Sequence, residues 1–229
     1  MQLRITLKQF FSFAVVKKIK DELQHIIFGN EQTGNTSQLK KTQNFLRGNA
    51  KTGSFIKNAK PLKSEEEICL IAFIQTENLF YSPEIPVLNF VAEGAEQRVY
   101  RLDDTYVIKL NQSVFYEYWL DYFNSLLVHN YFFSATQYEL LGFKIIDQKI
   151  FAVVKQEFIT ATEPTDLNAV KHFLEYNGFA NKRNNDYFNQ ELGIIFEDLH
   201  DENVLSQNQI LYFIDTVFYL TKEFYKNTL

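Results

Sequence analysis

The stretch FEDLHDENVL, residues 196–205, places five polar or charged side chains among the six residues from Asp198 to Asn203. Apolar runs stand on both sides of the stretch, with Glu197 between the first run and Asp198. The stretch is either an acidic surface turn or a loop end that holds a metal ion and faces a reactive hydroxyl. Asp198 stands five positions before Asn203, and Asp215 follows at the end of the next apolar run, ILYFID. Because a carboxylate and an amide oxygen on adjacent loop ends suit Mg²⁺, the second interpretation is chemically coherent.

Several short segments elsewhere in the chain, rich in β-branched and aromatic residues, are predicted strands. They are VLNFVAE (87–93), QRVYRL (97–102), TYVIKL (105–110), YELLGFKII (138–146) and KIFAVVKQEFI (149–159). Asp103–Asp104 and Asp147–Gln148 predict tight turns between neighbouring strands. Further short strands are expected in LGIIFEDL (192–199) and NVLSQNQILYFID (203–215), on either side of the opening stretch.

Helices are predicted between and before these strands. The ranges are 5–28, 64–79, 113–133 and 166–179, with a further helix over 216–226. Ser64 and Glu67 form the pattern of a capping box, and Asn177–Gly178 is a helix stop. Residues 29–64 are expected to form a polar loop. Within them, GNAKTGSF (48–55) has the glycine spacing of a phosphate-binding loop, but Ser54 stands where the lysine is required, so that motif is rejected.

Composition allows one domain, or one domain with an extension, because the 229 residues are 46% hydrophobic. The net charge is −5, yet residues 1–63 hold 12 Lys and Arg against three acidic residues. This basic front is either a solvated surface or a surface that faces a partner. It has no aromatic stacking pattern or recognised motif, so nucleic-acid binding is not expected.

The same composition bears on the compartment. The lone Cys69 is interpreted as a small buried apolar residue, which fits a reducing compartment such as the cytoplasm. No apolar run approaches the length that a membrane-spanning helix needs, so no membrane segment is expected. FFSFAVV (10–16) resembles a short signal core, but KKIKDELQ follows it at once, so no signal peptide is expected.

The order of strands, helices and acid-bearing loop ends resembles the protein-kinase-like fold from about residue 87 to 217. This resemblance implies that Asp198 faces the attacking hydroxyl and that Asn203 and Asp215 bind metal. TYVIKL resembles the V-A-I-K strand, so Lys109 would grip the α- and β-phosphates of ATP and Val107 would lie over the adenine.

Three further features of the resemblance are less complete. In AEGAEQRV (92–99) only Gly94 and Val99 match the glycine-rich loop. The hinge that meets the adenine edge would lie at residues 156–159, with Gln156 and Phe158 among its contacts. An acid on the helix 113–133 should pair with Lys109, and Glu117 is the first candidate, with Asp121 as the reserve. His200 either positions Asp198 or is a turn histidine bonded to backbone.

The resemblance implies an α+β, protein-kinase-like fold with a small antiparallel-sheet N-lobe, a truncated C-lobe and an N-terminal helical extension. Residues 1–82 would form the basic helical extension, packed on the catalytic lobe. Residues 83–229 would form a minimal catalytic domain, with the N-lobe at about 83–158 and the C-lobe at about 159–229. H-R-D is Phe196–Glu197–Asp198 here, and D-F-G is Asp215–Thr216–Val217. The sequence reaches Leu229 soon after Asp215, so no activation segment or full helical lobe is expected there.

The sequences of these motifs are similar to those of a small group of kinases found in bacterial polyvalent proteins. Membership implies an ATP- and Mg²⁺- or Mn²⁺-dependent kinase that phosphorylates Ser, Thr or Tyr hydroxyls of a protein substrate and also itself. It also implies a bacterial effector, translocated into a host cell. Two other functions are open: a small-molecule phosphotransferase of the aminoglycoside-kinase type, and a non-catalytic nucleotide-binding module.

Overall fold

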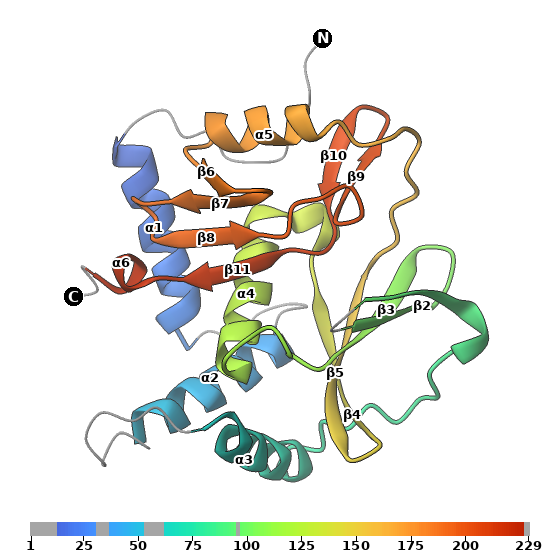
Figure 1. Ribbon diagram of the computed structural model, residues 1–229. Helices are drawn as coiled ribbons and strands as arrows, with labels where there is room; N and C mark the ends of the chain where they lie inside the picture. Colours follow the sequence, from blue (N-terminus) through green and yellow to red (C-terminus); the bar gives the residue numbers. More distant parts are fainter. Residues whose placement is uncertain (1–12, 31–36, 53–61, 95–96, 227–229) are drawn as a thin grey trace. The chain divides into compact units, whose positions relative to one another are not determined.

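The computed structural model describes residues 13–30, 37–52, 62–94 and 97–226, which form a mixed α+β fold with antiparallel sheets (Figure 1). The chain divides into two compact units. The first, here called the loop unit, comprises Met1–Gly29, Asn124–Gln137 and Ile159–Leu229. The second, the sheet unit, comprises Asn30–Phe123 and Tyr138–Phe158. No helix among the described residues is long and apolar enough to cross a membrane.

The sheet unit is built on an antiparallel sheet. Among the described residues its strand order is β1-β2-β3-β5-β4. The strands are β1 (Phe90–Glu93), β2 (Gln97–Arg101), β3 (Tyr106–Asn111), β4 (Glu139–Ile146) and β5 (Lys149–Glu157), and a short 3-10 turn, η3 (Val87–Asn89), precedes them. The predicted strands are therefore confirmed within a few residues. The predicted turn at Asp147–Gln148 is also confirmed, since both residues have the positive φ of a two-residue hairpin loop.

The two faces of this sheet carry different residues. One face holds a core of Tyr100, Ile108, Leu110, Phe151 and Val153. The opposite face holds Val99, Lys109 and Val154, which are direct cross-strand partners and therefore point to the same side. Because side chains alternate along a strand, the core on one face fixes which residues the other face presents.

Helices α2 (Ser37–Thr52) and α3 (Lys63–Thr76) also belong to the sheet unit. The sequence prediction of a loop over 29–64 is wrong where α2 lies. The start of α3 also differs from prediction: Leu62 is the N-cap, and its amide donates to Glu65 Oε2 at 3.1 Å, so Ser64 lies inside the helix. Cys69 is exposed rather than buried, because α3 buries the face of Leu70 and Ile74.

The loop unit contains a second antiparallel sheet and a hairpin. Among the described residues the sheet order is β11-β8-β7-β6, and β9 pairs with β10. The strands are β6 (Ala180–Arg183), β7 (Asp186–Asn189), β8 (Ile194–Glu197), β9 (Val204–Gln207), β10 (Ile210–Phe213) and β11 (Val217–Leu220). Helix α5 (Leu167–Tyr176) confirms the predicted helix at 166–179, since Asp166 caps it by accepting from the Asn168 amide at 2.9 Å.

Stacked phenylalanines form the core under the acid-bearing strands of the loop unit. Phe196, two residues before Asp198, stacks on Phe218 with ring centroids 4.1 Å apart. Phe213, two residues before Asp215, stacks on Phe133 at 4.4 Å. Burying large aromatic rings contributes strongly to stability, so this stack holds both strand ends that carry the candidate site.

The segment after Asp215 departs from prediction. A helix was expected over 216–226, but β11 forms there and pairs with β8, and only Lys222–Tyr225 is helical, as α6. Gly193 permits α6 to approach closely, because a Cβ at Gly193 would lie 2.1 Å from the Phe224 amide nitrogen. Helix α1 (Phe13–Phe28) packs against α6 in the same unit (Figure 1). Residues 1–12, part of the predicted helix 5–28, lie outside the described residues.

Candidate active site

Asp198 and Asn203 are joined directly within the loop that follows β8. The amide nitrogen Nδ2 of Asn203 donates to the backbone oxygen of Asp198 at 2.8 Å and to its Oδ2 at 2.9 Å. Asp198 has φ 64°, a left-handed conformation that Asp and Asn tolerate better than other non-glycine residues. The sequence-predicted pair therefore forms one hydrogen-bonded unit. Its carboxylate side chain is 57% exposed.

His200 contacts both the backbone and the candidate acid. Its Nδ1 accepts from the Glu202 amide at 3.3 Å. Its Nε2 lies 3.2 Å from Asp198 Oδ1 and 3.1 Å from Asn203 Nδ2. The two sequence interpretations of this histidine are thus compatible, because one ring nitrogen bonds backbone while the other faces Asp198.

Asp215 is held next to Asn203 through the backbone. The carbonyl oxygen of Asn203 accepts from the amides of Ile214 at 3.0 Å and Asp215 at 3.4 Å. Since Nδ2 of Asn203 is committed to Asp198, Oδ1 is the atom of this amide that can bind a cation. One amide oxygen and one carboxylate fit Mg²⁺, which takes a few protein oxygens and completes its shell with phosphates and water. No cluster of three His, Cys, Asp or Glu suited to a metal occurs among the described residues.

The β6–β7 turn supports the same loop, a contact that no sequence pattern predicts. The Asp198 amide donates to Asp186 Oδ1, and the Leu199 amide donates to the Asn185 carbonyl, both at 3.3 Å. Burial and the nearby charges of Asp186 and Asp198 raise the pKa of Glu197. The only local signal was the turn-forming run Asn184–Asn185–Asp186, which indicates a turn and not its partner.

The residues expected to bind nucleotide share one face of the sheet unit. Val107 pairs with Gln156, and Lys109 pairs with Val99, so all four side chains point to the face opposite the core. Lys109 is 3% exposed, and its ammonium lies 5.4 Å from the centre of the Tyr138 ring. Two valines beside a buried ammonium suit an adenine ring followed by phosphates, and Arg101, the cross-strand partner of Val107, is a second cation on this face. Gly94 lies at the end of β1, where its amide donates to the Gln97 carbonyl at 2.9 Å.

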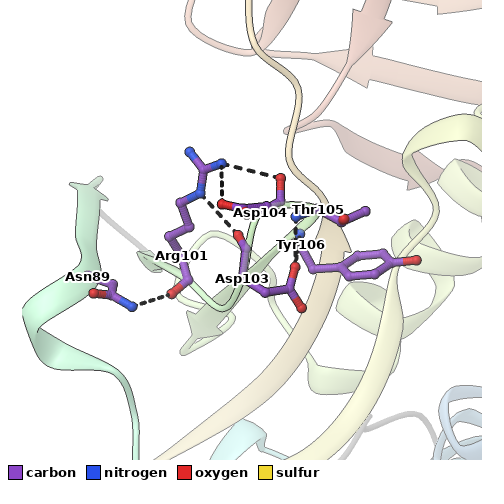
Figure 2. A network of polar contacts seen from close by, with 6 residues as sticks. All are labelled: Asn89, Arg101, Asp103, Asp104, Thr105 and Tyr106. Atoms are coloured by element: carbon purple, nitrogen blue, oxygen red, sulfur yellow. Dashed lines mark hydrogen bonds and ion pairs between the residues drawn. The ribbon is translucent and has the colours of Figure 1, made fainter.

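The β2–β3 turn is tied to the expected hinge. Figure 2 shows Arg101 donating to the carbonyls of Asp103 and Asp104, while Asp103 Oδ1 accepts from the amides of Thr105 and Tyr106. The Arg101 guanidinium also lies 4.1 Å from the Phe158 ring centre. The Phe158 amide donates to the Thr105 carbonyl at 2.7 Å, so a nucleotide would have to meet this segment through other groups.

Glu117 does not lie on a helix, contrary to the sequence prediction. Helix α4 runs Trp119–Phe132, and Glu117 is exposed in the bend before it. Desolvation and a hydrogen bond with Glu117 raise the pKa of the Tyr118 hydroxyl to about 12. Asp121, the reserve candidate, lies in the first turn of α4 and is half-buried. The helix begins late because Ser113 has φ 57° and the chain turns at residues 114–118. Pairing of Lys109 with either acid stays a prediction.

The start of α4 is held by a residue that no local sequence pattern indicates. Glu66 of α3 accepts from the Trp119 amide at 2.6 Å and the Leu120 amide at 3.1 Å. Glu67 accepts from the Trp119 indole at 3.0 Å, and the Lys63 ammonium lies 5.9 Å from that ring. Burial raises the pKa of Glu66. Contacts between segments so distant along the chain leave no local pattern to find.

Each unit carries some of the candidate residues. In the loop unit, the Asp198 carboxylate is bonded to the Asn203 amide, whose backbone carbonyl accepts from the Asp215 amide. In the sheet unit, Lys109 is buried on the same face as Val99 and Val107. The family of serine/threonine/tyrosine kinases found in polyvalent proteins matches residues 63–222 of the chain. The chain belongs to this family and is a protein kinase by that membership. No curated protein and no solved structure matches it significantly.

Proposed function

We propose that the protein transfers the γ-phosphate of ATP to Ser or Thr hydroxyls of a protein substrate, with Mg²⁺ or Mn²⁺. The observation that carries the proposal is Asn203, whose side chain bonds Asp198 and whose carbonyl bonds the Asp215 amide. Phosphoryl transfer needs mainly positioning and neutralisation of charge, and this residue positions both acids at once.

In this proposal each residue has one role. Asp198 orients the acceptor hydroxyl and takes its proton as the oxygen bonds to the γ-phosphorus and the bond to the ADP oxygen breaks. Asn203 Oδ1 and the Asp215 carboxylate hold the cation, which neutralises phosphate charge. Lys109 would bind the α- and β-phosphates, Val99, Val107 and Gln156 would line the adenine site, and Gly94 would contact the phosphates.

The test is transfer of labelled phosphate from ATP to the protein itself and to a generic protein acceptor. Asp198→Asn and Asp215→Asn should each lower the rate at least about 100-fold, the usual contribution of a general base or charge-stabilising group. Asn is chosen at 198 because it tolerates the left-handed backbone. Asp201→Asn is the matched control, since Asp201 is an exposed acid in the same loop. Transfer that survives both substitutions would refute the assigned roles.

The identity of the phosphate acceptor distinguishes this proposal from the alternative of a small-molecule phosphotransferase. A small-molecule phosphotransferase would also carry Asp-Leu-His in this loop, as residues 198–200 do. A screen of aminoglycosides and other small hydroxyl compounds alongside protein acceptors distinguishes the two. ATP binding without transfer to any acceptor, unchanged by Asp198→Asn, would instead indicate a binding module.

The proposal has a further part that rests on resemblance. We also propose, from the sequences of its motifs, a likeness to the bacterial cell-translocating kinase A, which would imply autophosphorylation and action as an effector in host cells. Intact-mass measurement after incubation with ATP and Mg²⁺ tests the first part, since an addition of phosphate should appear in the wild type and not in Asp198→Asn. Detection of the protein inside co-cultured host cells tests the second.

A further inference from the structure

A buried histidine on α4 is bonded to the residue that follows Asp215. His129 is fully buried, and its Nδ1 lies 2.7 Å from Thr216 Oγ1. Its Nε2 lies 2.7 Å from the Thr136 carbonyl oxygen. A carbonyl oxygen can only accept, so Nε2 carries the proton of the neutral ring and the Thr216 hydroxyl donates to Nδ1. The kinase roles assigned above do not use His129.

The same network reaches the chain on the other side of Asp215. Thr136 Oγ1 donates to the Phe213 carbonyl at 2.6 Å. Phe213 lies two residues before Asp215 and Thr216 one residue after it. The Asn203 carbonyl accepts from the Ile214 and Asp215 amides between them. Each residue from 213 to 216 is therefore held by a hydrogen bond. The bond to Phe213 comes from Thr136, and the bond from Thr216 goes to His129.

We propose that His129 is a positioning residue for the Asp215 carboxylate and acts through the Thr216 hydroxyl. Where the kinase motif D-F-G has Phe and Gly after the aspartate, this chain has Thr216 and Val217, so a polar bond to α4 is available at this position. The bond fixes the backbone after Asp215 and thereby the direction of its side chain. The inference rests on the proposed metal-binding role of Asp215.

The test compares two substitutions at Thr216. Thr216→Val keeps the shape and removes the hydroxyl, while Thr216→Ser keeps the hydroxyl. The measurement is the Kd of ADP over a series of Mg²⁺ concentrations, with direct binding of Mn²⁺ to the nucleotide complex as the second readout. We expect Thr216→Val to raise about tenfold the Mg²⁺ concentration that gives half of the maximal effect on ADP affinity. This is the usual result of losing a residue that orients a metal ligand. Thr216→Ser should restore it to within about twofold of the wild type.

Ser125→Ala is the matched control. Ser125 is also on α4, and its hydroxyl accepts from the Phe218 amide at 3.0 Å, so it ties the same helix to β11 three residues beyond Asp215. Its loss should lower the melting temperature without shifting the cation requirement. His129→Asn provides a second variant, because the Asn Oδ1 can take the place of Nδ1 as acceptor and should retain more cation affinity than His129→Leu.

The possible results distinguish a failure of this inference from a failure of the kinase proposal. Equal cation requirements in Thr216→Val and Ser125→Ala would overturn the positioning role while the kinase proposal stands. A wild-type protein whose ADP affinity does not depend on Mg²⁺ or Mn²⁺ would overturn both. A cation shift confined to Thr216→Val and His129→Leu, with Thr216→Ser close to wild type, supports the inference.

Discussion

At the scale of single residues, Asn203 joins the proposed catalytic acid to the proposed metal ligand. Its Nδ2 donates twice to Asp198, and its carbonyl accepts from the Asp215 amide. An oxygen at the Nδ2 position would remove both donated bonds and place a lone pair against the Asp198 carboxylate. A residue that only bound the cation would not be sensitive to this change, since a carboxylate binds Mg²⁺ at least as well as an amide.

Asn203→Asp is therefore expected to impair the enzyme although it adds a metal-binding charge. Phosphate transfer should fall about 100-fold or more, and the free energy of unfolding should fall by about 1 kcal/mol, as for a partly buried polar pair that loses its donor. Kinetics at saturating Mg²⁺ and denaturant unfolding measure the two effects. Unchanged transfer in Asn203→Asp would mean that the bond to Asp198 is not required.

The sequence could supply those residues of the site that have fixed spacing along the chain. Asp198, Asn203 and Asp215 follow a known interval, and Lys109 follows a strand pattern. Glu66, His129 and Asp186 were not selected, because each acts through a partner far away in sequence, such as His129 with Thr216. A spacing pattern describes what one segment can do. It does not indicate which distant segment packs against that segment.

At the scale of elements, α3 caps α4 from outside the helix. Both carboxylate oxygens of Glu66 accept from amides of the first turn of α4, which have no partners within the helix. The negative charge also lies at the positive end of the helix dipole. In this way α3 fixes where α4 begins, at Trp119 rather than at the position 113 that the sequence pattern predicted.

Glu66→Ala should lower the free energy of unfolding by about 1–2 kcal/mol, the usual effect of removing a helix cap. Glu65→Ala is the control: Glu65 is on the same helix and exposed, and its carboxylate serves only the start of α3. Denaturant unfolding of both variants measures the difference. An equal effect for the two would show that the cap on α4 contributes nothing of its own.

Helix α2 shows why one element escaped prediction. Its packed face contains Lys40, Thr42 and Gln43 beside Leu39 and Leu46, and all five are buried. Polar residues at buried positions conceal the apolar period that indicates a helix. Burial and the nearby charge of Arg47 lower the pKa of Lys40 from 10.5 to about 8.

The lowered pKa of Lys40 makes the stability of the folded protein depend on pH, and it fixes the direction of that dependence. The folded state disfavours charged Lys40, which lowers the free energy of unfolding. This loss is complete below about pH 8 and disappears as pH rises through the pKa of the unfolded state near 10.5. Wild-type stability should therefore rise relative to Lys40→Met by about 3 kcal/mol between pH 7.5 and 10.5. Paired denaturant titrations at the two pH values measure it, with Lys41→Met as the partly exposed control. A constant difference would show that Lys40 is not desolvated.

At the scale of the whole molecule, segments from both ends of the chain complete the loop unit. In α1, the Lys20 ammonium donates to the Glu223 carbonyl at 2.7 Å, and the Gln24 amide donates to the Phe224 carbonyl at 2.6 Å. The Phe28 and Phe224 rings lie 6.2 Å apart. The sequence predicted a helical front and short strands near Asp215, but it could not predict this association, because the partners lie near opposite ends of the chain.

Disturbing α1 should therefore weaken the unit that carries Asp198, Asn203 and Asp215. Leu23 is fully buried on α1, and Leu23→Ala is expected to lower the free energy of unfolding by about 2–5 kcal/mol, as buried leucines do. Lys18→Ala on the same helix is the control, because the Lys18 side chain is 76% exposed and its ion pair with Glu22 is a surface pair. Unfolding curves and phosphate transfer measured on both variants test the association. If α1 were a separate extension, Leu23→Ala would melt the helix alone and leave transfer at the wild-type rate. If α1 completes the loop unit, stability and transfer should fall together as the temperature approaches the lowered midpoint.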